Sequence, residues 1–365
     1  MAKKLISVWL SATILLFSTI TIYAEENVEG QFLNRNIDIN GNRIANYYLE
    51  YPFFLHEGSA YMPLSREAGQ LLGFSAEMDW ESRTLKILKD EPSQKDLTKE
   101  KLKNNLENLS ATILEDVTIM IMSEEERFPA VFNDRLVEEL ILAPRLEVEK
   151  IDINDYPLIQ SGQALYLPVR AFAGDNCFGW DVLYDEYSGL YISTNPEISA
   201  KEFFDKEESD YNRGLINYIL HKNKNLSQGW AAMLVFLFKH EAEVNGVDEK
   251  LLMAMAQKES TFRHDAVGRN GPVGLMQIMP GTAERYGISR SELFDPHTNI
   301  EFGTKYIKDK LVQYNNDQTI ALSAYNQGGL AISRGSYNTR YATNIAGAEK
   351  TINQYLTNNG YGLGN

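Results

Sequence analysis

The sequence predicts a multidomain fold: two small α+β modules, each an antiparallel sheet plus a helix, followed by a mostly α-helical domain. Three observations lead to this expectation. The chain has 365 residues, more than one hydrophobic core usually organises. Two segments of its first half resemble each other, which is typical of a duplicated supersecondary unit. From about residue 229 onward apolar residues recur at helical spacing, and no convincing strand pattern is found.

Residues 1–24 have the pattern of an export signal. Lys3 and Lys4 precede an uncharged apolar run over residues 5–23, and Ala24 is followed by two acidic residues. A basic start, an apolar stretch and a small residue before a polar segment are typical of a signal peptide. The run approaches the length that spans a bilayer, so a retained membrane tether through residues 5–23 is the alternative. Either interpretation predicts a secreted protein, located outside the cytoplasm or in the cell envelope.

Composition and charge exclude several classes of protein. The chain is 44% hydrophobic and 23% charged, as in globular rather than disordered proteins. Its net charge is −15, nearly all of it before Glu241, because acidic and basic residues almost balance from there on. An acidic protein lacks the counterion release that drives binding to phosphate backbones, so no nucleic-acid partner is expected. Cys177 is the only cysteine and the five histidines lack metal-ligand spacing, so we expect no disulfide, metal or cofactor.

The first half of the chain contains an internal repeat. The segments over residues 58–87 and 162–192 both begin with a glycine, a short alternating strand and a proline. Each continues into an amphipathic helix, reaches a second glycine and ends in a strand pattern that predicts a hairpin. The upstream pieces NIDINGNRI and KIDINDYPLI also resemble each other and supply a candidate first strand for each repeat.

This strand–helix–hairpin pattern, with Arg66 or Arg170 after the proline, resembles the small domain named after the N-terminal region of copper amine oxidases. The resemblance implies module 1 over residues 31–90 and module 2 over residues 111–195, separated by a charged linker over residues 91–110. The family name does not imply copper. The only histidine in either module is His56, whereas copper sites need clustered imidazoles. We expect the modules to act as a structural spacer.

A second charged connector is expected over residues 196–228, followed by the helical domain over residues 229–360. The apolar run from Trp230 to His240 is too short to cross a membrane and predicts a buried core helix. Asp248 is a suitable N-cap for the next helix, whose apolar positions lie on one face. Further helices are predicted for NIEFGTKYIKDKLVQY, TIALSAYNQGG and AEKTINQYL, and a loop for GPVGLMQIMPGTAERYG.

Glu259 is the candidate for acid–base chemistry. It lies one helical turn beyond Met255 and seven residues beyond Leu252, so it continues the inward-facing stripe of its helix. Burial raises the pKa of a carboxyl group, and an acid still protonated near neutral pH can donate its proton to a leaving oxygen. Taken alone, a glutamate at a helix end is more commonly solvated, so the neighbouring motifs decide the interpretation.

Three polar clusters accompany Glu259: GLMQ at residues 274–277, SAYNQGG at residues 323–329, and Tyr341. Phenols, amides and methionine surfaces suit sugars, which present hydroxyls, N-acetyl groups and apolar ring faces. The ordered motifs resemble the soluble-type lytic transglycosylase (SLT) domain, a branch of the lysozyme-like superfamily, over about residues 229–356. The residues that carry this resemblance are Glu259-Ser260, Gly274-Leu275-Met276-Gln277, Pro280, Thr282-Ala283, Asp295, Asn299, Gly303, Tyr306, Ala324-Tyr325-Asn326 and Gly328.

The resemblance implies a peptidoglycan lytic transglycosylase, a lyase whose partner is the glycan strand of the cell wall. Glu259 would be the single catalytic acid that cuts the β-1,4 bond between N-acetylmuramic acid and N-acetylglucosamine. It would protonate the glycosidic oxygen and then, as carboxylate, accept the proton of the muramoyl 6-hydroxyl as that oxygen closes onto C1. The product is a 1,6-anhydro end, and the second carboxylate of most glycosidases is not needed. The implied substrate-binding residues are Ser260, Met276, Gln277, Tyr325, Asn326 and Tyr341.

Other roles compete with these assignments. Ser260 could cap its helix, Met276 could fill the core, and Gln277 could satisfy the backbone of its loop. Tyr325 or Tyr341 could hydrogen-bond Glu259 and hold it in place. Two further functions also stay open. One is a lysozyme- or chitinase-like hydrolase that uses Asp265 or Glu284 to steer water, and the other is a non-catalytic cell-wall glycan-binding protein.

Overall fold

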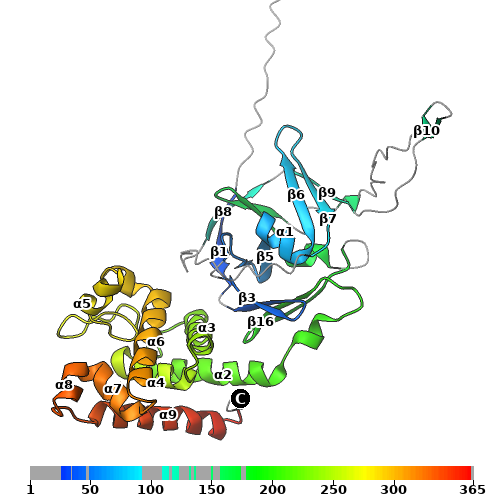
Figure 1. Cartoon of the computed structure of the whole chain (residues 1–365). Helices are drawn as coiled ribbons and strands as arrows, with labels where there is room; N and C mark the ends of the chain where they lie inside the picture. Colours follow the sequence, from blue (N-terminus) through cyan, green and yellow to red (C-terminus); the bar gives the residue numbers. More distant parts are fainter. Residues whose placement is uncertain are drawn as a thin grey trace, which may run out of the picture.

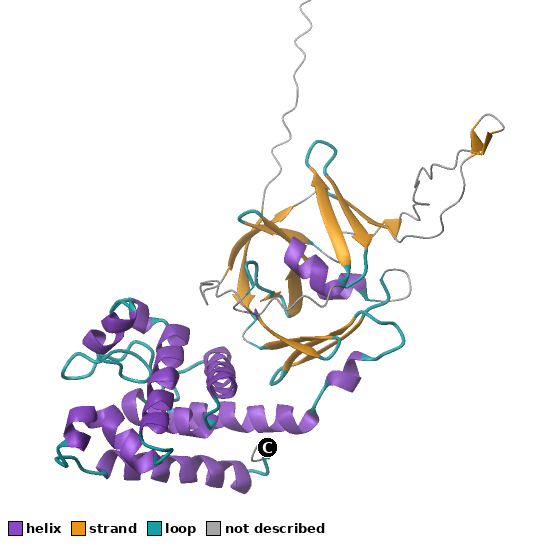
Figure 2. Ribbon diagram, viewed as in Figure 1, coloured by secondary structure: helices purple, strands orange, loops and turns teal. Residues whose placement is uncertain are grey.

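The computed structural model shows a strand-rich N-terminal part and a helical C-terminal part (Figures 1 and 2). The predicted export segment and Cys177 lie outside the described residues, and so does most of the linker predicted over residues 91–110. Within the described residues, no helix has the length and apolar character needed to cross a membrane. The structure describes residues 26–33, 35–46, 49–92, 109–114, 117–122, 131–132, 135–136, 149–150, 157–173 and 178–362.

The N-terminal part is built around a closed six-stranded barrel, in which the strands follow the order β1-β4-β5-β14-β13-β8. Its interior is filled by aromatic and aliphatic side chains, among them the stacked rings of Phe54 and Tyr61. The strands are β1 (Glu26–Phe32), β4 (Phe54–His56), β5 (Ser59–Pro63), β8 (Leu109–Leu114), β13 (Leu158–Ser161) and β14 (Ala164–Pro168).

Two four-stranded sheets flank the barrel, in the orders β12-β9-β7-β6 and β15-β16-β2-β3. The first contains β6 (Phe74–Asp79), β7 (Thr84–Lys89), β9 (Thr118–Met122) and β12 (Glu149–Lys150). The second contains β2 (Asn36–Ile39), β3 (Asn42–Ala45), β15 (Asp181–Asp185) and β16 (Gly189–Ser193). A separate pair is formed by β10 (Val131–Phe132) and β11 (Arg135–Leu136).

The two repeats share the barrel, which differs from the expectation of two modules with a sheet each, although the hairpin of each repeat lies in its own four-stranded sheet. Strand β5 of the first repeat pairs with β14 of the second, with Pro63 opposite Tyr166 and Tyr61 opposite Pro168. Equivalent positions thus face each other reciprocally, as across a two-fold axis. The hairpin of each repeat also gains a parallel neighbour from elsewhere, because β7 pairs with β9 and β16 pairs with β2. One buried apolar core therefore serves both repeats.

The helix of the second repeat is also shorter than expected. In the first repeat, Ser65 accepts a hydrogen bond from the Ala68 N–H and starts helix α1 (Arg66–Leu72). In the second repeat, Pro168 precedes the equivalent turn and no side chain caps it. A 3₁₀ helix, η3 (Val169–Phe172), forms instead, in keeping with the loss of an N-cap.

The C-terminal part packs its helices around α4, whose residues from Leu251 to Ala256 are all buried. It contains α2 (Lys206–Lys222), α3 (Gln228–Asn245), α4 (Glu249–Ser260), α5 (Pro280–Ala283), α6 (Pro296–Gln313), α7 (Gln318–Gln327), α8 (Gly329–Ser333) and α9 (Arg340–Asn358). Short 3₁₀ helices are η4 (Ala200–Phe203), η5 (Glu284–Tyr286) and η6 (Glu292–Phe294).

The connector expected over residues 196–228 contains helix α2, which belongs to the helical core. Tyr211, Leu215 and Ile219 recur every four residues and are buried in the same cluster as α4. Their spacing is helical, but many charged residues lie between and before them. For that reason the sequence predicted a solvated connector instead of a core helix. The helical unit therefore begins at α2 rather than at residue 229.

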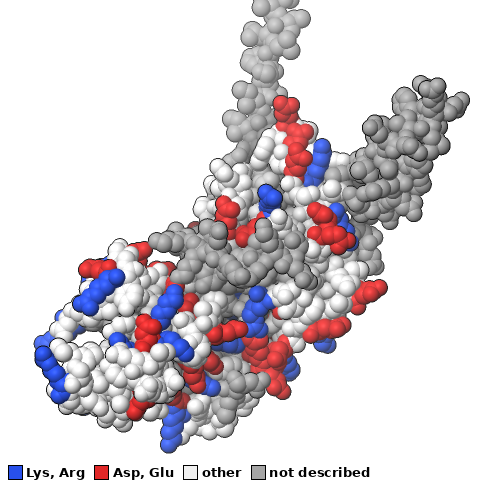
Figure 3. All heavy atoms as spheres, in the orientation of Figure 1, with Lys and Arg blue, Asp and Glu red and all other residues white. Residues whose placement is uncertain are grey.

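Polar contacts join the strand-rich part to the helical part. Glu208 of α2 binds both Arg43 of β3, at 2.7 Å, and Lys239 of α3, at 2.8 Å. Gln228, at the start of α3, donates to the Glu186 carboxylate, and Phe32 of β1 is buried in the helical core. On the face shown in Figure 3, acidic side chains gather beside this junction, whereas both signs of charge are interspersed over the helices.

Candidate active site

Helix α4 carries Glu259 in its last turn. Asp248 caps the start of the helix by accepting from the Lys250 N–H at 2.7 Å. After Ser260 the chain turns sharply through Thr261 and Phe262, which both have positive φ, at 54° and 60°. A left-handed conformation costs an L-residue about 1–2 kcal/mol, and burial of the Phe262 ring against Phe238 offsets part of that cost. Glu259 is thus held at a helix end that tertiary packing stabilises.

The Glu259 carboxyl group is partly buried. Burial raises its pKa above the usual value, while the Tyr341 hydroxyl and the charge of Lys258 oppose this increase. The expectation of a carboxyl group whose pKa is raised by an apolar setting agrees with this environment. Such a group stays protonated over a wider pH range than a solvated glutamate, as a general acid requires.

The Tyr341 hydroxyl is the polar group that faces this carboxyl. Tyr341 is 7% exposed, and its hydroxyl has no partner within hydrogen-bond geometry among the described residues. It nevertheless lies close enough to Glu259 to stabilise the ionised carboxylate. A buried hydroxyl without a partner is unfavourable, so it is available to bond either the carboxylate or a ligand.

Three tyrosines from three helices form a row next to Glu259. The rings of Tyr341 and Tyr325 lie 6.5 Å apart and nearly parallel, and Tyr306 meets Tyr325 edge-on at 5.4 Å. Burial, and then the nearby Glu259 charge, raise the pKa of both Tyr325 and Tyr341 well above the usual phenol value. Both phenols therefore stay neutral and can act as hydrogen-bond donors.

The loop that follows α4 is tied to helix α6 by Asn299. The buried Asn299 side chain accepts from the Met276 N–H at 2.8 Å and donates to the carbonyls of Val273 and Leu293. Gly274 has φ 82°, and a Cβ there would overlap the Asn299 amide. The Met276 carbonyl in turn accepts from the Tyr325 hydroxyl at 2.9 Å. Asn299 thus orients Tyr325 through one intermediate residue.

The side chains of three of the predicted substrate-binding residues bond the backbone or fill the core. Ser260 is buried, donates to the Ala256 carbonyl and accepts from the Arg263 N–H, so it ends the helix. Met276 is fully buried against Gly303 and fills the core. The Gln277 amide donates to the carbonyls of Ala266 and Gly274 and braces the loop. These are the alternative roles that the sequence had left open.

The other predicted site residues fall into two groups. Tyr325 and Tyr341 are brought together beside Glu259. Asn326 lies near the end of α7 with its side chain exposed, so it is accessible to a ligand.

Met279 is an exposed residue of the GLMQ loop that the motifs do not indicate. Its side chain is 46% exposed, whereas Leu275, Met276 and Ile278 of the same loop are buried. Met279 therefore offers the soft apolar surface that Met276 was expected to provide. The proline that follows it opens α5 and marks a boundary, but sequence alone does not show which methionine faces outward.

Among the described residues, the groups that influence the pKa of Glu259 are Tyr341 and Lys258. No second carboxylate is among them. Asp265 and Glu284, the two candidates for steering water, are both exposed. In the part of the chain that the structure describes, no group of three or more His, Cys, Asp or Glu side chains is arranged to hold a metal ion.

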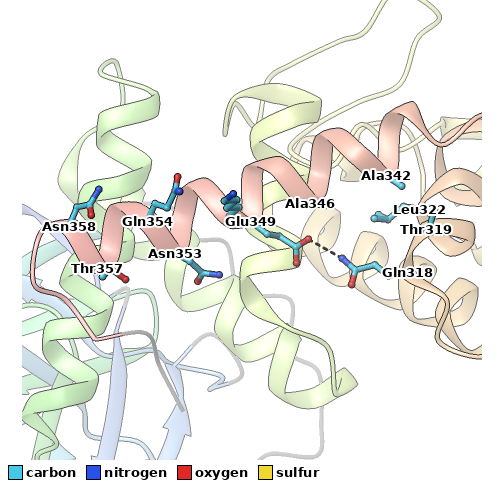
Figure 4. A pocket seen from close by; sticks show the side chains of 11 residues that line it. Gln318, Thr319, Leu322, Ala342, Ala346, Glu349, Asn353, Gln354, Thr357 and Asn358 are labelled. Carbon is cyan, nitrogen blue, oxygen red and sulfur yellow. Dashed lines mark hydrogen bonds between the residues drawn. The ribbon is translucent and has the colours of Figure 1, made fainter.

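A separate hollow of about 650 Å³ lies along α9 and the start of α7, and its lining does not include Glu259 or the tyrosines (Figure 4). Gln318 donates to the Glu349 carboxylate across it at 2.9 Å. Burial raises the pKa of Glu349. The hollow is open and amide-rich, and it contributes no group to the site around Glu259.

Comparison with known proteins assigns the helical unit to a domain family. Residues 236–346 match the Transglycosylase SLT domain. The soluble lytic murein transglycosylase of Escherichia coli (strain K12) is 36% identical over 100 residues, covering 25% of this chain and 16% of that protein. Membrane-bound lytic murein transglycosylase C of Photorhabdus laumondii is 39% identical over 105 residues, covering 24% of this chain and 29% of that protein. The C-terminal part of the chain therefore contains an SLT domain.

Among solved structures, the 70 kDa soluble lytic transglycosylase of Escherichia coli aligns with a TM-score of 0.28 and 25% identity, over 41% of this chain and 30% of that chain. The chain spans less than a third of the length of these relatives. The matched relatives are transglycosylases by name. The segment that matches the family model includes Glu259, the GLMQ loop and Tyr341.

Proposed function

We propose that the chain is a peptidoglycan lytic transglycosylase in which Glu259 acts as a single general acid and base. The observation that carries this proposal is the setting of Glu259. Burial raises the pKa of its carboxyl group, two neutral phenols lie beside it, and no second carboxylate influences it among the described residues. The SLT domain match over residues 236–346 supports the same class of reaction.

The reaction follows from these groups in two proton transfers. The protonated Glu259 donates its proton to the glycosidic oxygen, and the bond from that oxygen to C1 of N-acetylmuramic acid breaks. The Glu259 carboxylate then accepts the proton of the muramoyl 6-hydroxyl as that oxygen bonds to C1. The carboxyl group regains its proton, the N-acetylglucosamine end leaves as an alcohol, and the muramoyl end becomes a 1,6-anhydro sugar.

Tyr341 and Tyr325 have distinct parts in this scheme. The Tyr341 hydroxyl has no partner in the resting protein and can donate to the Glu259 carboxylate once that group has lost its proton. The Tyr325 hydroxyl already donates to the Met276 carbonyl, so its ring forms a wall of the site instead. Met279 and Asn326, both exposed, are suited to contact the sugar rings.

The reaction is tested by mass spectrometry of the products released from purified sacculi. The proposal expects 1,6-anhydro-muramoyl ends from the full-length protein and none from Glu259→Gln, which keeps the shape but cannot transfer the proton. Hydrated reducing ends would instead indicate a hydrolase of the same fold. Unchanged biological activity of Glu259→Gln, with glycan binding retained, would indicate a binding protein.

We also infer that the protein acts outside the cytoplasm, since residues 1–24 have the pattern of an export signal or tether. The joined repeats then serve as a non-catalytic spacer that holds the SLT domain near the wall, in keeping with their resemblance to copper amine oxidase N-terminal domains. A reporter enzyme active only outside the cytoplasm, fused after the last residue, tests the location. Loss of reporter activity is expected on deletion of residues 2–24.

A further inference from the structure

One exposed aromatic pair near Glu259 has no part in the reaction described above. Trp230 lies in the first turn of α3 and is 37% exposed. Its ring stacks on the His264 imidazole, with 4.8 Å between centroids and only 9° between planes. Trp230 also precedes the segment that matches the SLT domain, so it is a feature of this chain outside the matched family region.

A short separation along the chain and one hydrogen bond place this pair near the end of α4 that carries Glu259. His264 follows Glu259 by five residues, so their Cα atoms are separated by less than about 17 Å even if the chain were fully extended. The turn through Thr261 and Phe262 shortens that separation further. Asn223, which ends α2, donates to the Thr261 carbonyl at 2.9 Å and fixes the α2–α3 connection against the end of α4.

The tryptophan is held in position rather than free to rotate. Ser227 caps α3 by accepting from the Trp230 backbone N–H at 3.2 Å. The indole ring stacks on the His264 imidazole, which restricts its rotation. His264 is in turn placed by the Phe294 carbonyl, 3.4 Å from its Nδ1 atom. A preorganised aromatic surface costs little conformational entropy when a ligand binds.

The chemistry of this surface suits a sugar. The face of a pyranose ring presents C–H groups, which pack on an indole, while the sugar hydroxyls remain solvated. The pair also lies at the junction with the strand-rich part, because Gly229 abuts the Gln31 side chain of β1. A glycan that leaves the Glu259 site in this direction would pass over Trp230 toward the barrel.

We propose that Trp230, positioned by His264, forms a distal sugar-stacking subsite that binds a glycan strand several sugars away from the bond cleaved at Glu259. This inference rests on the proposed function, because it takes the ligand to be the same glycan. Its consequence is a preference for long strands: short fragments fill only the catalytic site, and longer strands also reach Trp230.

The test measures binding in the full-length Glu259→Gln chain, which cannot cleave its ligand. The probes are short and long oligosaccharides of N-acetylglucosamine, titrated by calorimetry. Trp230→Ala in this background is expected to weaken binding of the long probe about tenfold and to leave the short probe unchanged. The matched control is Trp80→Ala, which removes another exposed tryptophan, 53% exposed, from the turn between β6 and β7.

Equal binding by the parent and the Trp230→Ala chain at every probe length would overturn the subsite, and so would an equal loss in the Trp80→Ala chain. If the alanine variant does not fold, Trp230→Gln takes its place, with the same loss expected. In the cleavage-competent protein, His264→Ala should raise KM for sacculi and leave kcat unchanged. A fall in kcat with KM unchanged would contradict a positioning role for His264.

These outcomes are separable from the proposed reaction. Hydrated products from the cleavage-competent protein would refute the transglycosylase reaction, but a length-dependent loss in Trp230→Ala would still establish the subsite. Anhydro products with no Trp230 effect would refute only the subsite.

Discussion

Replacement of Tyr341 by phenylalanine should make the protein less active, and more stable at acidic pH, where Glu259 is protonated. The Tyr341 hydroxyl is buried and has no hydrogen-bond partner among the described residues. A buried polar group left unpaired costs about 1–3 kcal/mol, so its removal should raise the free energy of unfolding by up to about that amount at acidic pH, where Glu259 is protonated. The gain should shrink as pH rises, because the ionised Glu259 loses the hydroxyl that stabilises it. Most substitutions of buried residues act in the opposite direction.

The loss of activity follows from the state of Glu259 after proton donation. The Tyr341 hydroxyl favours the ionised carboxylate, and a hydrogen bond to a charged group contributes about 1.5–3 kcal/mol. Loss of that contribution in the transition state corresponds to a fall in kcat of about 10- to 100-fold. Without the hydroxyl the pKa of Glu259 rises further, so the alkaline limb of the pH–rate profile should move to higher pH.

Two assays on the same protein preparations check this prediction: urea denaturation for stability, and release of anhydro-muropeptides from sacculi across a pH series. Tyr306→Phe is the matched control, since Tyr306 lies at the far end of the same aromatic row and its pKa is not influenced by Glu259. A Tyr341→Phe protein that is destabilised at acidic pH, or that keeps full activity with an unshifted profile, would refute the reasoning.

Three further predictions concern the same site. Glu259→Gln should become progressively more stable than the wild type as pH rises above the ordinary glutamate pKa of 4.5, because burial raises the folded-state pKa and ionisation then destabilises the folded protein. Denaturation of both proteins across pH checks this, and a pH-independent difference in their free energies of unfolding would contradict it. Asn299→Ala should lower the free energy of unfolding by at least about 3 kcal/mol, since it strands one backbone N–H and two carbonyls at about 1–3 kcal/mol each, and a urea midpoint close to that of the wild type would argue against the role of Asn299. Gly303→Ala would place a Cβ 2.4 Å from the Met276 sulfur, so we expect a loss of about 1–3 kcal/mol and reduced activity through displacement of Tyr325, measured by thermal unfolding and product release.

Local patterns predicted the helices and the place of Glu259. Asp248 caps α4, where the sequence predicted an N-cap. Apolar spacing placed Glu259 on the inner stripe of α4, and the raised pKa of its carboxyl group agrees with that position. Capping and helical periodicity depend on residues within one or two turns of each other, so a single sequence contains them.

The tertiary structure decided which side chains of the motifs are buried and which are exposed. Ser260, Met276 and Gln277 belong to the motifs of the SLT family, yet their side chains are committed to a helix end, the core and the loop backbone. The outward direction of Met279 depends on how the loop packs against Asn299. A motif identifies the residue types at a site, but their orientation is set by contacts with distant helices.

By itself the sequence predicted a duplicated N-terminal region and a helical SLT domain, and it placed Glu259 on the inner stripe of one helix. Only the tertiary structure showed that strands of the two repeats pair with each other, that α2 belongs to the helical core, and that Trp230 stacks beside the catalytic helix. The physical reason is the separation along the chain of the residues that interact. Helix patterns and caps are local, whereas strand pairing and ring stacking join residues far apart in the chain and depend on how whole elements pack.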